Sequence, residues 1–557
     1  MKYLKLLLLS IISGLLLWLS EAPNGFPFLA FFAFVPLFFI SDQLLKTKTR
    51  FPVWFGAIYS YPAFFIWNIL TTWWIWYSSK EGATAAIVLN ALFMSLIFGF
   101  WHCFKTYKPV KWLIPFIFIS FWASFEYLHL NWQITWPWLN LGNIFAQATR
   151  YVQWYEYTGT FGGTIWILSL NFIIYEIIQK FISYRHHQST QSSDIRNAKK
   201  QFWILVGVWA SLIIIPILIS VVIYSSYNIK KDNGFEAVIV QQNTDPWEEQ
   251  YRMSNISHVK RIIKTAKSKI SDQTAFIIAP ESAIPHNISI QELVDKTYPV
   301  QTYEYYGFKL IDTFLMQYPN ANLIVGLSTN QRYKGMQTPT TRNPSPGLYY
   351  DAFNTSVCYN SQGTVGYYHK SKLVPGVEKM PYPQVFSFLE NIVIDLGGTS
   401  GSLGIDSCQK AFTAQTLTRK IKIGAPICYE SIFGELFGNF VKDGAEVMAV
   451  ITNDAWWKDS PGHKQHFIMS KLRAIETRRY VLRAANTGTS AFINPLGEVS
   501  QETKYGVRTA IKEVVYPNDE ITFYVKHGDY LARFCVALTA LFLLFGTYLW
   551  SIKKFKK

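Results

Sequence analysis

The sequence carries little charge for its length. Only 16% of its 557 residues are Asp, Glu, Lys or Arg, whereas 50% are hydrophobic and 17% are aromatic. Soluble globular domains carry about 25% charged residues, so this composition argues against a chain that is soluble throughout. The apolar residues gather in long runs before about residue 227 and again after residue 529, a distribution typical of a membrane protein.

Cysteine is also scarce. The spacing of the five cysteines matches neither a disulfide framework nor a CxxC metal pattern. An oxidising compartment would allow a disulfide between Cys358 and Cys408, although free buried cysteine is also common. The five are Cys103, Cys358, Cys408, Cys428 and Cys535.

Complete metal-ligand sets are missing as well. His463 and His466 stand three residues apart, but no third His or carboxylate completes a site beside them. We therefore predict that the chain holds no metal and no soluble cofactor, and we interpret both histidines as polar surface residues.

Eight apolar runs are present, seven before the polar part of the chain and one after it. Most are long enough to cross a hydrocarbon core of about 30 Å as a helix. Lys2 and Lys5 precede the first run as in a signal peptide, but no A-x-A cleavage site follows, so we predict a retained helix. Trp73, Trp74 and Trp76 are interpreted as interface anchors. The runs lie near Leu4–Leu19, Phe26–Ile40, Val53–Trp76, Ala83–Phe104, Leu113–Leu130, Thr164–Phe181, Phe202–Tyr224 and Tyr530–Trp550.

The net charge is +16, and the basic residues are distributed regularly along the chain. A basic balance also occurs in nucleic-acid-binding proteins, but here Lys and Arg concentrate in every second loop and in the tail at 553–557. Such loops stay on the cytoplasmic side of a membrane. We therefore predict no nucleic-acid partner, both termini in the cytoplasm, and the polar part between runs seven and eight on the periplasmic side.

The polar part, residues 228–528, has the pattern of a soluble α/β domain. Short apolar strands recur, and amphipathic helical stretches separate them. The chain thus divides into a seven-span domain (1–227), a polar α/β domain (228–528) and a last helix with a basic tail (529–557). The expected strands are Ala237–Val240, Ala275–Ala279, Leu323–Val325, Ile421–Ile427 and Glu446–Ile451, and the expected helices include Val259–Ile270 and His466–Glu476.

Polar residues directly follow several of these strands. Glu281 comes after the second expected strand and Cys428 after the fourth. Ligands bind beyond the carboxyl ends of strands in open α/β sheets, so these residues are expected to share one site. A thiol needs a base or a cation nearby to become a nucleophile. Glu281 would accept its proton and Lys370 would stabilise an oxyanion, although each residue taken alone is more typical of a core or surface position.

Taken together, these motifs resemble the nitrilase superfamily, whose signature is a Glu, a Lys and a Cys at successive strand ends. With seven spans before the domain and one after it, the arrangement is similar to the apolipoprotein N-acyltransferase branch. This resemblance implies an αββα sandwich carried by eight membrane helices. The matching stretches are Pro280–Pro285, Lys370 before Leu373-Val374-Pro375, Ile427–Glu430, Asn453–Trp456 and, in the membrane half, Pro137–Gly142.

The resemblance also implies a role for each residue. Glu281 is then the general base, Lys370 the oxyanion stabiliser and Cys428 the nucleophile. Glu378 matches a second essential acid of the family. Tyr429 and Glu430 match residues that support the nucleophile from the next positions in the chain. Trp247 matches a Trp that contacts the substrate.

The implied reaction takes place in the bacterial inner membrane. An acyl chain passes from a phospholipid to Cys428 as a thioester, and then to the N-terminal amine of a diacylglyceryl-cysteine on an apolipoprotein. Two other functions remain open. A membrane-anchored amidase would use the same three residues with water, and a transporter or receptor would use the domain only to bind. Intramembrane charge would mark a transport path, and Glu126 is the main candidate.

An apolar segment, Val385–Leu396, is predicted to form a lid that guides lipid toward the nucleophile. Phe386 and Phe388 would face the membrane, and the neighbouring Pro and Gly residues would serve as flexible ends. The alternative is an ordinary buried helix or strand of the sandwich.

Overall fold

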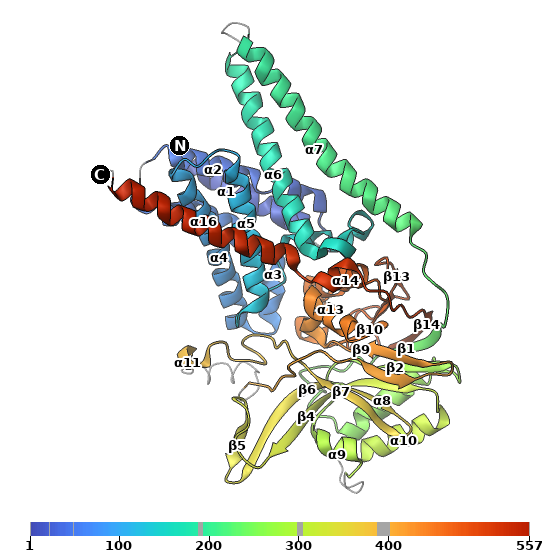
Figure 1. Cartoon of the computed structure of the whole chain (residues 1–557). Coiled ribbons are helices and arrows are strands. Elements are labelled where there is room, and N and C mark those ends of the chain that lie inside the picture. Colours follow the sequence, from blue (N-terminus) through green and yellow to red (C-terminus); the bar gives the residue numbers. More distant parts are fainter. Residues whose placement is uncertain are drawn as a thin grey trace.

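The computed structural model describes residues 2–21, 23–47, 49–187, 193–297, 305–386 and 402–555. It has two halves, a bundle of long helices and a mixed α/β half that lies against one end of the bundle (Figure 1). The chain leaves the bundle once to build the α/β half. Its last helix then returns and packs against α5 (Figure 1).

Within the described residues, the bundle contains eight helical segments that are long and apolar enough to cross a membrane. They coincide in order with the eight apolar runs of the sequence, so this half has the design of a multi-pass membrane domain. The segments are α1 (Lys2–Ser20), η1 (Pro27–Phe31) with α2 (Val35–Leu45), α3 (Pro52–Thr72) with η2 (Trp73–Tyr77), α4 (Lys80–Thr106), α5 (Leu113–Asn131), α6 (Tyr155–His187), α7 (Ser193–Ser226) and α16 (Tyr530–Phe555).

The second apolar run is broken rather than one continuous helix. Pro36 lies in the first turn of α2, where its missing N–H is tolerated, so the helix begins there and a separate 3-10 turn precedes it. Asn171 of α6 satisfies the backbone at the break. Its Oδ1 accepts from Phe34 N at 2.8 Å and its Nδ2 donates to Ala30 O at 2.7 Å. Irregular backbone at membrane depth needs partners of this kind.

The connection between α5 and α6 contains η3 (Leu141–Gln147) and η4 (Thr149–Tyr151). Glu126 of α5 holds its start. One carboxylate oxygen accepts from Leu141 N at 2.8 Å and from Trp122 Nε1 at 3.0 Å, and the other accepts from Thr164 Oγ1 at 2.7 Å. This intramembrane acid therefore anchors a loop through neutral donors.

The α/β half contains two sheets. The first has strand order β14-β1-β2-β4-β6-β5, with β3 added on β4 and β7 on β6, and the second has order β13-β12-β11-β10-β9-β8. The first comprises β1 (Phe235–Gln241), β2 (Thr274–Ile278), β3 (Ile284–Ser289), β4 (Asn322–Tyr333), β5 (Arg342–Ser345), β6 (Leu348–Asn360), β7 (Gly363–His369) and β14 (Thr509–Val515). The second comprises β8 (Phe412–Gln415), β9 (Lys420–Gly424), β10 (Val447–Thr452), β11 (Val481–Ala485), β12 (Ala491–Ile493) and β13 (Val499–Ser500).

The two sheets pack face to face. Phe276 and Ile324 of the first sheet share a buried cluster with Ile423 and Val450 of the second. Helices cover the outer faces, which gives the αββα sandwich expected from the sequence. The helices on the side of the first sheet are α8 (Asn255–Ala266), α9 (Ile290–Asp295) and α10 (Tyr306–Gln317). The helices on the side of the second sheet are η6 (Cys428–Ile432), α13 (Gly434–Lys442), η7 (Asp454–Trp457), α14 (Pro461–Thr477) and α15 (Phe523–His527). The short helix α11 (Pro383–Phe386) belongs to neither layer.

One predicted strand is shorter than expected. The stretch Ile421–Ile427 was predicted as a single strand, but β9 ends at Gly424. Pro426 has no N–H to donate to a ladder, and beyond it Ile427 pairs only through an isolated bridge to Ile451. The chain is therefore free to turn sharply just after this bridge, at Cys428.

Candidate active site

Cys428 occupies a sharp turn at the start of η6. Its backbone has φ +50°, in the left-handed region that costs a non-glycine residue energy. Two hydrogen bonds hold the turn. Ile427 N donates to Glu430 Oε2 at 2.9 Å, and Ser431 Oγ donates to the Cys428 carbonyl at 2.7 Å. The residue is buried, and 9% of its surface is exposed.

Glu430 joins this turn to the loop that carries Lys370. Its side chain is completely buried, and its other oxygen, Oε1, accepts from Tyr368 Oη at 2.6 Å, Ser371 N at 2.7 Å and Lys372 N at 3.1 Å. Burial raises the pKa of Glu430, while these hydrogen bonds lower it. The carboxylate fixes the separation between the nucleophile turn and the Lys370 loop.

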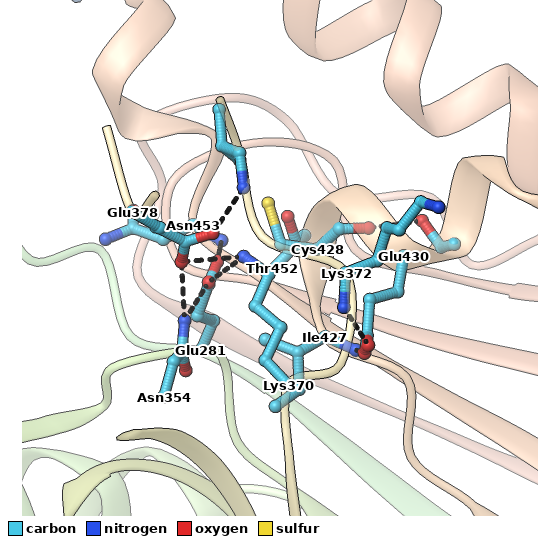
Figure 2. Close-up of polar contacts among 12 residues, drawn as sticks. Glu281, Asn354, Lys370, Lys372, Glu378, Ile427, Cys428, Glu430, Thr452 and Asn453 are labelled. Atoms are coloured by element: carbon cyan, nitrogen blue, oxygen red, sulfur yellow. Dashed lines mark hydrogen bonds and ion pairs between the residues drawn. The ribbon is translucent and has the colours of Figure 1, made fainter. Parts of the chain in front are cut away.

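Lys370 lies between two carboxylates (Figure 2). Its Nζ is 2.9 Å from Glu378 Oε1 and 3.3 Å from Glu281 Oε1. Asn354 Nδ2 donates to the same two oxygens, at 3.1 Å and 2.7 Å. Although burial lowers the pKa of Lys370, the two carboxylates raise it well above its ordinary value, so the amine is a cation.

The backbone holds both carboxylates in place. Asn453 N donates to Glu281 Oε2 and Val374 N donates to Glu378 Oε2, each at 2.9 Å. Gly326 of β4 lies directly against Glu281, and a Cβ there would come within 2.6 Å of the Glu281 Cα. Asn354 and Gly326 were not predicted as site residues, since nothing in their local sequence distinguishes them. Asn453 was given no role of its own, although it lies in one of the stretches that carry the family resemblance.

The thiol, the ammonium and the carboxylate influence one another. Burial raises the pKa of the Cys428 thiol, the Glu281 carboxylate raises it further, and the Lys370 ammonium lowers it. The resting thiol is therefore neutral and has a carboxylate close by to take its proton. A carbonyl carbon that reached Sγ would place its oxygen near a fixed cation, which is the arrangement that acyl transfer requires.

A second buried network lies beside Cys428. Asp454, His466 and Arg483 have no exposed surface. Arg483 Nη2 is 2.8 Å from Asp454 Oδ2, and His466 Nδ1 is 2.9 Å from Asp454 Oδ1. Burial raises the pKa of Asp454, but Arg483 and His466 outweigh it and hold this pKa well below its ordinary value.

The sequence prediction for the two histidines was therefore wrong. Both are buried, His463 with 1% of its surface exposed and His466 with none. The prediction also missed the carboxylate, since Asp454 precedes His466 by 12 residues and is not at a helical spacing from it, so the two meet only through the fold.

Three potential metal ligands meet at this point. Cys428 Sγ, one oxygen of Asp454 and one ring nitrogen of His466 lie within 4.8 Å of one another. Arg483 Nη2 contacts both Asp454, at 2.8 Å, and His466, at 3.0 Å. A guanidinium already neutralises the carboxylate, so these donors fit an arginine better than a metal ion.

The membrane half reaches this site directly. Tyr429 Oη donates to the Thr135 carbonyl at 2.8 Å, and Tyr429 belongs to the hydrophobic cluster of the helical bundle. Gln465 Oε1 accepts from Trp74 Nε1 at 3.0 Å and from Trp138 Nε1 at 2.8 Å. Trp74 was predicted as an interface anchor, which is wrong, because it is 1% exposed and joins the two halves.

Comparison with known proteins agrees with this arrangement. Residues 237–515 match the carbon-nitrogen hydrolase family, and residues 13–173 match the apolipoprotein N-acyltransferase N-terminal domain. The chain belongs to the carbon-nitrogen hydrolase family. The N-terminal match places it in the branch of that family formed by the apolipoprotein N-acyltransferases.

Among the relatives that match over nearly the whole chain are two apolipoprotein N-acyltransferases. The apolipoprotein N-acyltransferase of Chlorobaculum tepidum is 26% identical over 96% of this chain and 95% of its own length. Apolipoprotein N-acyltransferase 1 of Treponema denticola is 24% identical over 97% of this chain and 96% of its own length. Among solved structures, an amidase from Nesterenkonia sp. is 12% identical and has a TM-score of 0.35, covering 55% of this chain and 98% of its own.

Of the remaining predicted residues of this carbon-nitrogen hydrolase, Trp247 lies at the surface. Trp247 is 47% exposed and packs edge-on against Trp456, with ring centroids 4.9 Å apart. Phe386 ends α11, whereas Phe388 and most of the predicted lid at 385–396 lie outside the described residues.

The two cysteines for which pairing was considered are both free thiols. Cys358 is buried and Cys408 is exposed. The structure thus contains no disulfide between them.

Proposed function

We propose that this chain transfers an acyl chain from a membrane phospholipid, through a thioester on Cys428, to the N-terminal amine of a diacylglyceryl-cysteine on an apolipoprotein. The observation that carries the proposal is the placement of Cys428 beside Lys370 and Glu281, in a turn that packs into the membrane half through Tyr429. A soluble substrate would not require the nucleophile turn to be built into a bundle of eight membrane-spanning segments.

The first half-reaction loads the enzyme. Glu281 accepts the proton of Cys428 as Sγ attacks the ester carbonyl of the lipid. Lys370 Nζ stabilises the oxyanion that forms. When the intermediate collapses, the C–O ester bond breaks and Glu281 returns the proton to the departing oxygen. The products are the thioester and a lysophospholipid.

The second half-reaction unloads it. The uncharged N-terminal amine attacks the thioester carbonyl, the oxyanion again forms beside Lys370, and Glu281 takes the proton from nitrogen. The C–S bond breaks and the sulfur takes a proton back from Glu281, which restores the resting thiol. An amide and the free enzyme result.

The other residues have positioning or binding roles in this scheme. Glu378 holds the amine of Lys370, and Glu430 and Tyr429 hold the nucleophile turn from opposite sides. Trp247, Phe386 and Phe388 are assigned to substrate binding, as the sequence suggested. No metal or soluble cofactor takes part.

The acyl-enzyme is the direct test. Purified protein is mixed with phosphatidylethanolamine vesicles and examined by intact-protein mass spectrometry. We expect one acyl adduct on the wild type and on Cys408→Ala, which removes an exposed thiol, and none on Cys428→Ala. An adduct on Cys428→Ala would defeat the proposal.

The acceptor separates transferase from amidase chemistry. The loaded enzyme is given either buffer alone or a synthetic peptide with an N-terminal diacylglyceryl-cysteine. We expect the adduct to persist in buffer and to move to the peptide amine. Rapid loss in buffer, with no labelled peptide, would instead identify a membrane-anchored hydrolase with the same three residues.

The proposal includes an orientation in the bacterial inner membrane, with residues 1–227 and 529–557 forming the membrane part and 228–528 the periplasmic domain. Its support is the alternation of Lys-rich and Lys-poor loops. Protease added to spheroplasts should cut the 228–528 domain and spare a tag placed after residue 557. Protection of the domain together with loss of the tag would reverse the topology.

A further inference from the structure

His466 contacts the backbone of the proposed nucleophile. Its Nε2 is 3.2 Å from the Cys428 carbonyl oxygen and 3.0 Å from Ser431 Oγ. The imidazole is completely buried and packs against two indoles, with ring centroids 5.7 Å from Trp138 and 5.6 Å from Trp457. The ring is therefore fixed in orientation, and Nε2 is directed at the turn that carries Sγ.

The hydrogen-bond partners determine where the ring carries its proton. A carbonyl oxygen can only accept, and the single proton of Ser431 Oγ already goes to that same carbonyl at 2.7 Å. Both groups in front of Nε2 are thus acceptors, so Nε2 must be the N–H. The imidazole donates to the Cys428 turn.

The other side of the ring suits this tautomer. Nδ1 lies 3.0 Å from Arg483 Nη2, a donor, and 2.9 Å from Asp454 Oδ1, an acceptor. A neutral ring accepts at Nδ1 from Arg483, and a protonated ring donates at Nδ1 to Asp454. Either way the N–H at Nε2 is kept, which makes the donor to Cys428 independent of the ring's charge.

We propose that His466 is a positioning residue for Cys428. By donating to the Cys428 carbonyl, it stabilises the left-handed turn at φ +50° and keeps Sγ directed toward Glu281 and Lys370. Asp454 and Arg483 act one step further away, by holding the imidazole. This role rests on the proposed function of Cys428 and adds residues that are not part of the Glu281, Lys370 and Cys428 set.

Two substitutions separate the donor from the ring. Glutamine can place an amide N–H near the position of Nε2, whereas the shorter asparagine reaches only the position of Nδ1. We expect His466→Asn to slow acyl-enzyme formation about 100-fold, the typical cost of a misplacement near 1 Å, and His466→Gln to keep most of the rate. The lipid concentration that gives half the maximal rate should not change in either variant.

His463 provides a matched control. It lies one turn earlier on α14 and is equally buried, but its Nε2 bonds to Asp459 at 3.0 Å and not to the nucleophile turn. His463→Asn should acylate at the wild-type rate. Thermal unfolding of all three variants shows whether a slow enzyme is still folded.

A second measurement needs no lipid. Alkylation of Cys428 by iodoacetamide, followed by peptide mass spectrometry across pH, reports the thiol alone. We expect its rate to fall in His466→Asn and to be restored in His466→Gln. Wild-type alkylation and acylation in His466→Asn would overturn the positioning role, as would equal losses in both variants.

The two proposals fail in different ways. Suppose that the wild-type protein formed no acyl adduct, but that the alkylation rate of Cys428 still fell in His466→Asn and recovered in His466→Gln. The proposed function would then be wrong, and the positioning role would stand.

Discussion

Two buried glutamates show how differently the halves of this molecule use charge. Glu126 in the bundle accepts hydrogen bonds from a backbone N–H, an indole and a hydroxyl. Glu281 in the α/β half accepts from a lysine ammonium, an amide side chain and a backbone N–H. The first is surrounded by neutral donors that need an acceptor, whereas the second is paired with a cation beside a thiol. Burial of a carboxylate alone therefore does not mark a reactive site. The groups that bond to the carboxylate decide whether it has a structural or a chemical role.

Replacement of Glu281 by Gln should produce the largest effect on the reaction. The amide keeps the size of the side chain but cannot take a proton, so acyl-enzyme formation should fall about 10²–10⁴-fold. One of the present donors would face the new NH₂ group, which costs about 1 kcal/mol of stability. Mass spectrometry measures the rate and thermal unfolding the stability. A rate near that of the wild type would remove Glu281 as the base.

Replacement of Glu126 by Leu should show the opposite pattern. It leaves the Leu141 N–H and the Trp122 indole N–H buried without an acceptor, at about 1–3 kcal/mol each. We expect a clearly lower unfolding temperature in detergent, with the acylation rate per folded molecule little changed. Glu126→Gln keeps an acceptor oxygen and serves as the control. A large loss of rate in the glutamine variant would give Glu126 a part in the chemistry.

Replacement of Tyr429 by Phe tests the contact between the halves. It removes the hydrogen bond to the Thr135 carbonyl, a net contribution of about 0.5–1.5 kcal/mol. If that bond aligns the nucleophile turn, acyl-enzyme formation should slow about two- to tenfold. Tyr367→Phe, at a partly exposed position in β7, is the control. Unchanged acylation in Tyr429→Phe would mean that the halves only pack together.

Removal of metal should have the smallest effect. Arg483 neutralises Asp454, and Asp454 and His466 bond to each other, so no metal is expected beside Cys428. Acylation in the presence of EDTA or 1,10-phenanthroline should equal that of the untreated enzyme. Inhibition by a chelator that added zinc reverses would contradict this reading of the cluster.

The eight membrane segments and the three proposed site residues were accessible from sequence because their signals are local. A run of about 20 apolar residues has few other fates than a membrane helix. Glu281 and Cys428 each stand in a short motif after an expected strand, and Lys370 stands in a short motif before Leu373-Val374-Pro375. The strand before Cys428 was predicted to end at Ile427, but it ends at Gly424. Pro426 interrupts the regular ladder, and the hydrophobicity of the segment alone does not reveal this end.

Other features depended on contacts between distant segments. Tyr429 and Thr135 are 294 residues apart in sequence, and Trp74 and Gln465 are 391 apart. Nothing near Trp74 distinguishes an interface tryptophan from one that joins two domains. The burial of His466 likewise depends on Asp454 and Arg483, which come from η7 and β11.

The sequence by itself determined the membrane segments and the class of the α/β half, and it singled out Cys428, Glu281 and Lys370 as candidates, because each signal lies in a short stretch of consecutive residues. Only the tertiary structure decided how the nucleophile turn is held. The left-handed conformation of Cys428 is stabilised by Glu430 and Ser431 nearby and by His466 from another helix. Buried polar groups must find partners wherever the fold supplies them, and the fold supplied these across long stretches of chain.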